Sequence, residues 1–107
     1  MPKALDMNIN TSIRDSTAVI RLEGRFDFAG HRDFREAFKA AVQSEAAREI
    51  QIDLRNVVYI DSSALGMLLL SLENAKAAGK TISLTGATGP VKQVLDIANF
   101  HKLFTIK

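Results

Sequence analysis

Alternating polar and apolar residues predict two strands at the start of the chain. In residues 6–15, DMNINTSIRD, apolar residues and threonine occupy every second position, which is the pattern of a half-buried strand. Residues 17–26, TAVIRLEGRF, alternate in the same way. Asp15 and Ser16 lie between the two runs and are typical turn residues. We therefore expect an antiparallel hairpin.

A helical period follows the hairpin, and a third strand follows the helix. Between Gly30 and Ser44, apolar residues recur at the spacing i, i+3, i+4, i+7 and i+8 of an amphipathic helix, at Phe34, Ala37, Phe38, Ala41 and Val42. Residues 49–60, EIQIDLRNVVYI, first alternate and then become almost continuously apolar. This pattern predicts a strand that leads into a more buried segment.

Two more helices and two more strands are expected toward the C-terminus. Residues 62–78 predict a second helix, and Gly79 is the residue type that commonly ends one. Its expected core stripe is Leu65, Leu68, Leu69, Leu72 and Ala75. The run TISLTGA predicts a strand, Pro90 fits the first turn of a third helix, and LFTIK predicts a last strand.

The order of these elements predicts the fold class. Strands that alternate with helices of about 10–15 residues imply parallel crossovers, while the first two strands form an antiparallel pair. We therefore expect one α/β domain over residues 1–107. Its sheet is mixed, mainly parallel, with an N-terminal antiparallel hairpin, and packs against about three helices.

Composition and charge narrow the function classes. The 107 residues include no cysteine, so disulfides, thiolate nucleophiles and cysteine-bound metals are excluded. The net charge is only +2 and the cations are scattered, so we expect no nucleic-acid partner. The longest apolar stretch falls short of the ~20 residues that a membrane span needs, and no signal-peptide core is apparent. We expect a cytoplasmic monomer that pairs transiently with partners.

The segment DSSALG, at the junction between the third strand and the second helix, carries the candidate chemistry. Asp61, Ser62 and Ser63 are all residue types that accept hydrogen bonds from the free amides of a helix start. An ordinary N-cap accounts for the aspartate and one serine. It leaves the second serine unexplained.

The second helix also has more apolar surface than one core stripe requires. Met67, Leu70 and Ser71 project away from the centre of the expected stripe, while Ala64 and Gly66 add little side-chain bulk to the first turn. One interpretation is that these residues flank a wide core stripe. The other is an apolar contact patch beside a hydroxyl, where methionine suits an adaptable binding surface.

These motifs together resemble a known family. The segments LEGRFD, VVYIDSSALG, TISLTG and VKQVLDIANF, in this order, resemble a STAS domain over nearly the whole chain, and most of all the small stand-alone anti-sigma factor antagonists. The resemblance implies that Ser62 is phosphorylated by a partner serine kinase that is itself the anti-sigma factor, with Ser63 as the alternative site. It also implies that the unphosphorylated form binds this kinase and frees a sigma factor, and that a PP2C-type phosphatase restores the serine.

The resemblance also implies which residues surround the phosphorylated serine. The environment of the site would consist of Asp27, Asp61, Ser63 and Gly66. The partner-binding residues would be Ala64, Met67, Leu70, Ser71 and Asn74. A phosphate at a helix N-terminus meets a favourable macrodipole and free amides, so the fold should tolerate it. The loss of binding must then arise at the interface.

Three other functions remain open at this point. An enzyme would need Ser62 or Ser63 as nucleophile with His31 or His101 as base, but the chain lacks G-x-S-x-G and metal-ligand spacings, so we expect no catalysis, metal or cofactor. A nucleotide-binding module would use the glycines of residues 86–89, which lack the lysine of a P-loop. A third function keeps the fold without phosphorylation, as a docking module of a larger signalling or transport assembly.

Overall fold

Five strands of the described chain form one sheet in the order β1-β2-β3-β4-β5. The structure is a computed structural model and describes residues 7–107. In chain order its elements are β1 (Asn8–Arg14), β2 (Thr17–Phe26), the short 3-10 helix η1 (Phe28–Gly30), α1 (His31–Gln43), β3 (Glu49–Ile60), α2 (Ser62–Ala77), β4 (Thr81–Thr85), α3 (Gly89–Ile97), η2 (Phe100–Lys102) and β5 (Thr105–Ile106).

The expected hairpin and the parallel crossovers are both present. β1 pairs antiparallel with β2, and the turn residues Asp15 and Ser16 both have positive φ, at 50° and 68°. The pairs β2–β3, β3–β4 and β4–β5 are all parallel. The predicted fold class is thus confirmed. The predicted first strand began at Asp6, which lies outside the described residues.

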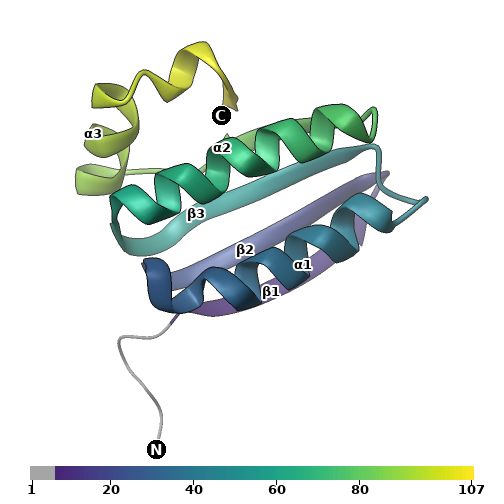
Figure 1. The fold of residues 1–107 in the computed structure, drawn as a ribbon, viewed down its shortest axis with the longest axis horizontal. Helices are drawn as coiled ribbons and strands as arrows, with labels where there is room; N and C mark the ends of the chain where they lie inside the picture. The colour runs from purple at the N-terminus through teal and green to yellow at the C-terminus, as the bar shows by residue number, and fades with distance from the viewer. Residues whose placement is uncertain (1–6) are drawn as a thin grey trace, which may run out of the picture.

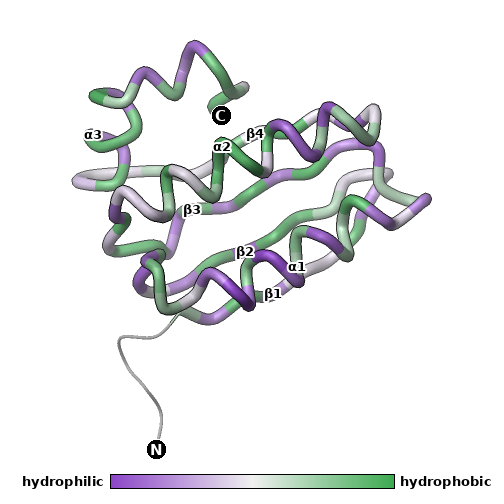
Figure 2. Tube along the Cα trace, viewed as in Figure 1, coloured by the Kyte–Doolittle hydropathy of each residue, from purple (hydrophilic) through white to green (hydrophobic). Residues whose placement is uncertain are grey.

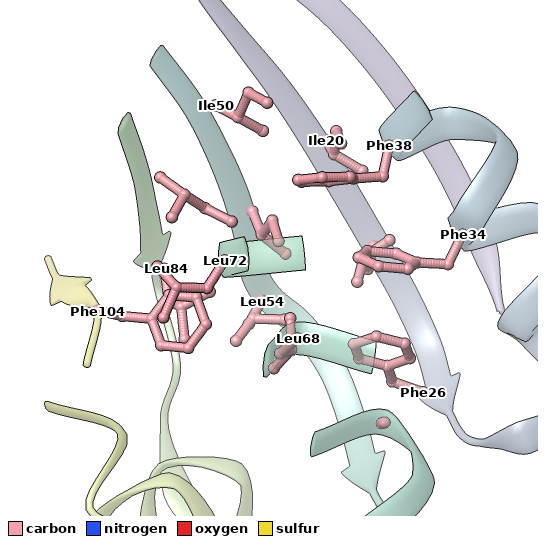
Figure 3. Close-up of a cluster of buried hydrophobic side chains, with 14 of the residues drawn as sticks. Ile20, Phe26, Phe34, Phe38, Ile50, Leu54, Leu68, Leu72, Leu84 and Phe104 are labelled. Carbon is pink, nitrogen blue, oxygen red and sulfur yellow. The ribbon is translucent and has the colours of Figure 1, made fainter. Parts of the chain in front are cut away.

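The helices α1 and α2 lie side by side over one face of the sheet (Figure 1). Phe34 and Phe38 of α1 and Leu68 of α2 point toward the strands in Figure 3, and all three are buried. The helix α3 lies beyond α2, against β3. The helices enclose the core and leave the carboxyl ends of β2 and β3 at one edge of the molecule.

The core-facing side of α2 differs from the predicted one because of how α2 packs on the sheet. The residues that α2 buries are Ala64, Leu68, Ser71, Leu72 and Ala75. Small side chains at three of these five positions let the helix approach the sheet closely. Leu69, predicted for the core, is 39% exposed, and Leu65 is only partly buried. The expected stripe was therefore wrong at Leu69.

The burial of the first and third strands also differs from the prediction. β1 is an edge strand, and only Ile9 among its seven residues is partly buried. In β3, the register with β4 ends at the pair Asp53↔Thr85, so the rest of β3 extends past its neighbour. Val58 has no partner in β2 either, because the register passes from Gly24↔Val57 to Arg25↔Tyr59; Val58 is 70% exposed, and Tyr59 is exposed too. The prediction of a more buried second half was wrong for these two residues.

The end of α2 is fixed by backbone geometry. Gly79 has φ 73°, and the amides of Gly79 and Lys80 donate to the carbonyl oxygens of Lys76 at 3.0 Å and Ala75 at 2.9 Å. These two bonds form a Schellman motif, which confirms the predicted role of Gly79. Lys80 then turns its ammonium back to the end of α1, where it donates to the carbonyl oxygens of Ala41, Ser44 and Ala47.

Candidate functional site

The site begins where two neighbouring strands end. Phe26 and Ile60 are register partners at the carboxyl ends of β2 and β3, and the amide of Asp61 donates to the carbonyl oxygen of Phe26 at 3.3 Å. Asp27 and Asp61 follow these strands directly, and each begins a helical segment. The sequence-predicted neighbours Asp27 and Asp61 therefore lie in adjacent loops.

Asp61 is the N-cap of α2. Its backbone is extended, and its carboxylate oxygen Oδ1 accepts the amide of Ala64 at 2.9 Å and the hydroxyl of Ser63 at 2.6 Å. Partial burial acts to raise the pKa of Asp61, but hydrogen bonds from the Ser63 hydroxyl and from the backbone amides of Ala64, Phe28 and Ser63 outweigh it. The pKa is held below its ordinary value, so Asp61 is ionised at neutral pH.

Asp27 holds the neighbouring loop in shape. Its Oδ1 accepts the amide of Ala29 at 3.1 Å, and its Oδ2 accepts the Nε of Arg25 at 3.4 Å. The guanidinium of Arg25 also lies 4.0 Å from the centre of the Tyr59 ring, a cation–π contact. Asp27 thus lies beside the site and orders its rim.

The two serines are not equivalent. Ser63 is partly buried and its hydroxyl is committed to Asp61. Ser62 is the first residue of α2 and is exposed, and within residues 7–107 no side-chain hydrogen bond engages its hydroxyl. The N-cap interpretation therefore accounts for Asp61 and Ser63. It leaves Ser62 as an accessible hydroxyl at the start of a helix.

The predicted partner surface is only partly at the surface. Leu70 is 51% exposed, Asn74 is exposed, and Met67 is partly buried. Ala64 and Ser71 are buried, and the hydroxyl of Ser71 donates to the carbonyl oxygen of Met67 at 2.8 Å. Both side chains have little exposed surface, so a direct contact of Ala64 or Ser71 with a partner stays a prediction.

Exposed apolar side chains near the site were missed by the sequence reasoning. Phe28 directly follows Asp27 and is 66% exposed, and Val58 and Tyr59 lie near the end of β3. Gly66 is exposed, with no atom within 4 Å of where a Cβ would lie. The sequence offered no signal for Phe28, because it continues the two-residue period of Leu22 and Phe26 and so looks like a further buried strand position.

The comparisons with known proteins identify the family. The family described as "Mlab, STAS domain" matches residues 9–105. The chain belongs to the STAS domain family. A STAS-domain-containing protein of Pseudomonas aeruginosa is 45% identical over 87 residues, which cover 81% of this STAS domain and 84% of the relative.

Relatives named as anti-sigma factor antagonists also match. The anti-sigma F factor antagonist of Paenibacillus polymyxa is 24% identical over 102 residues, covering 95% of this chain and 87% of the relative. The structure of an anti-sigma factor antagonist from Mycobacterium paratuberculosis superimposes with a TM-score of 0.85 at 19% identity, covering 99% and 89% of the two chains. The latter similarity establishes a shared fold.

The other candidate residues of this STAS domain have local roles. The Nδ1 atom of His31 lies 2.8 Å from the carbonyl oxygen of Phe28, and its ring stacks on the Phe28 ring at 4.6 Å. His101 is exposed in η2. Gly86 has φ 75° and packs closely against β3. Among residues 7–107, no helix has both the length and the apolar composition to cross a membrane.

Proposed function

We propose that this STAS domain is an anti-sigma factor antagonist whose binding is switched by phosphorylation of Ser62. The observation that supports the proposal is that Asp61 and Ser63 form the cap of α2 while Ser62 remains exposed. The relatives named as antagonists support the same role. A phosphate on Ser62 would break no hydrogen bond that the described residues make with its side chain.

The switch acts through the surface around Ser62. A phosphoserine carries about −1.5 to −2 charges at pH 7, and the helix N-terminus favours an anion. The exposed apolar side chain of Phe28, whose backbone amide is hydrogen-bonded to Asp61, suits a contact with another protein. A dianion buried at such a contact without a partner costs several kcal/mol, and each 1.4 kcal/mol is tenfold in affinity. Phosphorylation therefore opposes binding without refolding the domain.

The proposed partners follow from this role. The unphosphorylated form binds an anti-sigma factor serine kinase and thereby releases a sigma factor. A PP2C-type phosphatase removes the phosphate from Ser62. We place this exchange in the bacterial cytoplasm and assign the STAS domain a binding role with no catalysis of its own.

Phosphopeptide mapping of the protein from its native cells tests the modification directly. We expect phosphate on Ser62 and none on Ser63, whose hydroxyl is bound to Asp61. Ser62→Ala should retain a kinase with a histidine-kinase-like ATPase fold in affinity capture, and Ser62→Asp should lose it. Ser63→Ala is the matched control and should retain the kinase. Both Ser62 variants should unfold at nearly the same denaturant concentration as the wild type.

A different set of outcomes would favour the docking module. Ser62 would stay unmodified across growth and stress conditions, and Ser62→Ala and Ser62→Asp would capture the same partners. No kinase would be among them. Unfolding of Ser62→Asp would contradict the argument that the helix start accepts an anion.

A further inference from the structure

A groove between α1 and α2 runs along α2 away from Ser62, and its lining includes four of the predicted partner-binding residues: Met67, Leu70, Ser71 and Asn74. It has a volume of about 1030 Å³. Phe34, Phe38 and Val42 of α1 lie on one side, and Met67, Leu70 and Asn74 of α2 lie on the other. Figure 2 shows that polar residues recur along α1 but gather in the C-terminal part of α2. The α1 side of the groove therefore combines apolar and charged side chains, whereas the α2 side has no charged side chain.

The charged side chains of the α1 side are mainly cationic. Arg32, Arg35 and Lys39 are exposed and line the groove from α1, at spacings of three and four residues that put them on one helix face. Glu36 is the single acid among the lining residues, so the charges sum to 3 − 1 = +2. In the described part of the chain, no carboxylate lies within 4.0 Å of these three cations. Their charge is available to a ligand.

We infer that this groove docks an amphipathic helix of a protein partner, with acidic residues along the edge that faces α1 and apolar residues along the edge that faces α2. A third helix fits the groove between two neighbouring helices by the same ridge-and-groove packing that joins helices within a protein. A peptide that binds by strand addition would instead require an unpaired strand edge, and helices form both walls here. Because the groove is cationic along α1, the edge of the partner helix that faces α1 should be acidic.

The groove extends away from Ser62 along α2. Met67 is five residues beyond Ser62 and Asn74 is twelve, so they lie about 7.5 Å and about 18 Å along the helix axis from it at 1.5 Å per residue. The Debye length in physiological salt is about 8 Å, so a phosphate on Ser62 acts mainly on the near end of the groove. The inference therefore goes beyond the proposed switch and does not depend on phosphorylation.

A titration of the ¹⁵N-labelled full chain with a designed helix tests the inference. The probe is a synthetic helix of about 15 residues, about 22 Å long, with glutamate along one edge of its contact face and leucine along the other. The control peptide carries lysine in place of every glutamate. We expect saturable shifts of amides in residues 32–43 and 67–78 with the acidic peptide, and at least tenfold weaker binding of the lysine peptide.

Matched variants separate the groove from net charge. Arg35→Glu combined with Lys39→Glu reverses two exposed groove cations, and Arg14→Glu combined with Lys102→Glu reverses two exposed cations elsewhere. The groove variant should lose at least tenfold in affinity for the acidic peptide, and the control variant less than threefold. Ser62→Asp should change the affinity less than threefold, which separates this inference from the proposed switch.

Several results would overturn the inference. One is no saturable shift up to about 1 mM peptide, the weak end of specific binding. Others are shifts that map outside the two helices, or equal losses in the groove and control variants while their spectra show a folded protein. A preference for anionic lipid vesicles over the acidic peptide, lost in the groove variant, would assign the groove to a membrane surface instead.

Discussion

Replacing Asp61 with alanine tests whether the start of α2 is held by a charged cap. The Oδ1 atom of Asp61 accepts the amide of Ala64 at 2.9 Å and the hydroxyl of Ser63 at 2.6 Å. Alanine removes both hydrogen bonds. The extended backbone at Asp61 is that of an N-cap residue, so the helix itself can keep its length in the variant.

The expected cost comes from these two bonds. Loss of an N-cap side chain costs about 1 kcal/mol, and loss of a hydrogen bond to a charged acceptor costs about 1.5–3 kcal/mol when the site is buried. Ser63 is only partly buried, so water replaces part of the second bond. We expect a decrease of about 2 kcal/mol in the free energy of unfolding, or about 8 °C in Tm for a domain of this size.

Urea unfolding at neutral pH measures this change, with Asp61→Asn as the matched control. Asparagine caps a helix as well as aspartate does but carries no charge, so Asp61→Asn should lose under about 1 kcal/mol. If Asp61→Ala unfolds at the same urea concentration as the wild type, the cap makes no net contribution and the reasoning is wrong. Equal losses in both variants would show that only the negative charge of Asp61 stabilises the start of α2.

The pH dependence gives a second check with a definite sign. The pKa of Asp61 is lowered in the folded state, so its stabilisation is present above the unfolded pKa of about 3.9 and disappears as pH falls through the folded pKa. The stability gap between the wild type and Asp61→Ala should narrow over that acidic range. The pKa of Glu49 is also lowered, chiefly by a hydrogen bond from Lys107, but it contributes equally to both proteins.

Three further substitutions test the packing and the turns. Leu68→Ala should cost about 2–5 kcal/mol of unfolding free energy in urea, while Leu69→Ala should cost under about 1 kcal/mol because Leu69 is partly exposed; similar losses would contradict the observed orientation of α2. Lys80→Met should cost about 1–3 kcal/mol by thermal unfolding, because it leaves carbonyl oxygens near the end of α1 without their charged donor; an unchanged Tm would refute that role. Gly86→Ala should destabilise by about 1–3 kcal/mol, because φ is positive there and a Cβ would lie 2.9 Å from a Cβ of β3. Gly66→Ala has open space around it and should stabilise by about 0.4–1 kcal/mol in the same urea assay. The reverse order of stability would count against both assignments.

Local patterns were sufficient to predict the elements and their order. The strand alternation of residues 17–26, the helical stripe of Phe34 and Phe38, and the glycine after α2 each report a local preference that the fold retains. The parallel sheet followed because helices alternate with strands. The cap at Asp61 was likewise open to prediction, since a cap involves only residues within one turn.

Burial at the helix surface was not predictable in the same way. A periodic run of leucines marks a helix, but which side meets the sheet depends on how closely the two approach. Ala64 and Ser71 let α2 approach closely, which turns Leu69 outward and buries two residues that were expected at the surface. Val58 is an extra residue of β3 between its pairs with Gly24 and Arg25 of β2, and such an irregularity depends on the partner strand, so the pattern within β3 alone could not reveal it.

The geometry around Ser62 explains how one hydroxyl can change a surface without changing a fold. If Ser62 itself capped α2, a phosphate would have to displace that cap, and phosphorylation would be coupled to the stability of the helix. Asp61 and Ser63 take the capping role instead, and the Ser62 side chain projects from the first turn. The proposed modification at this position would alter charge and shape beside the exposed Phe28, while the core residues Ala64 and Leu68 stay packed. Because the capping serine and the exposed serine are different residues, the proposed switch can act without unfolding the domain.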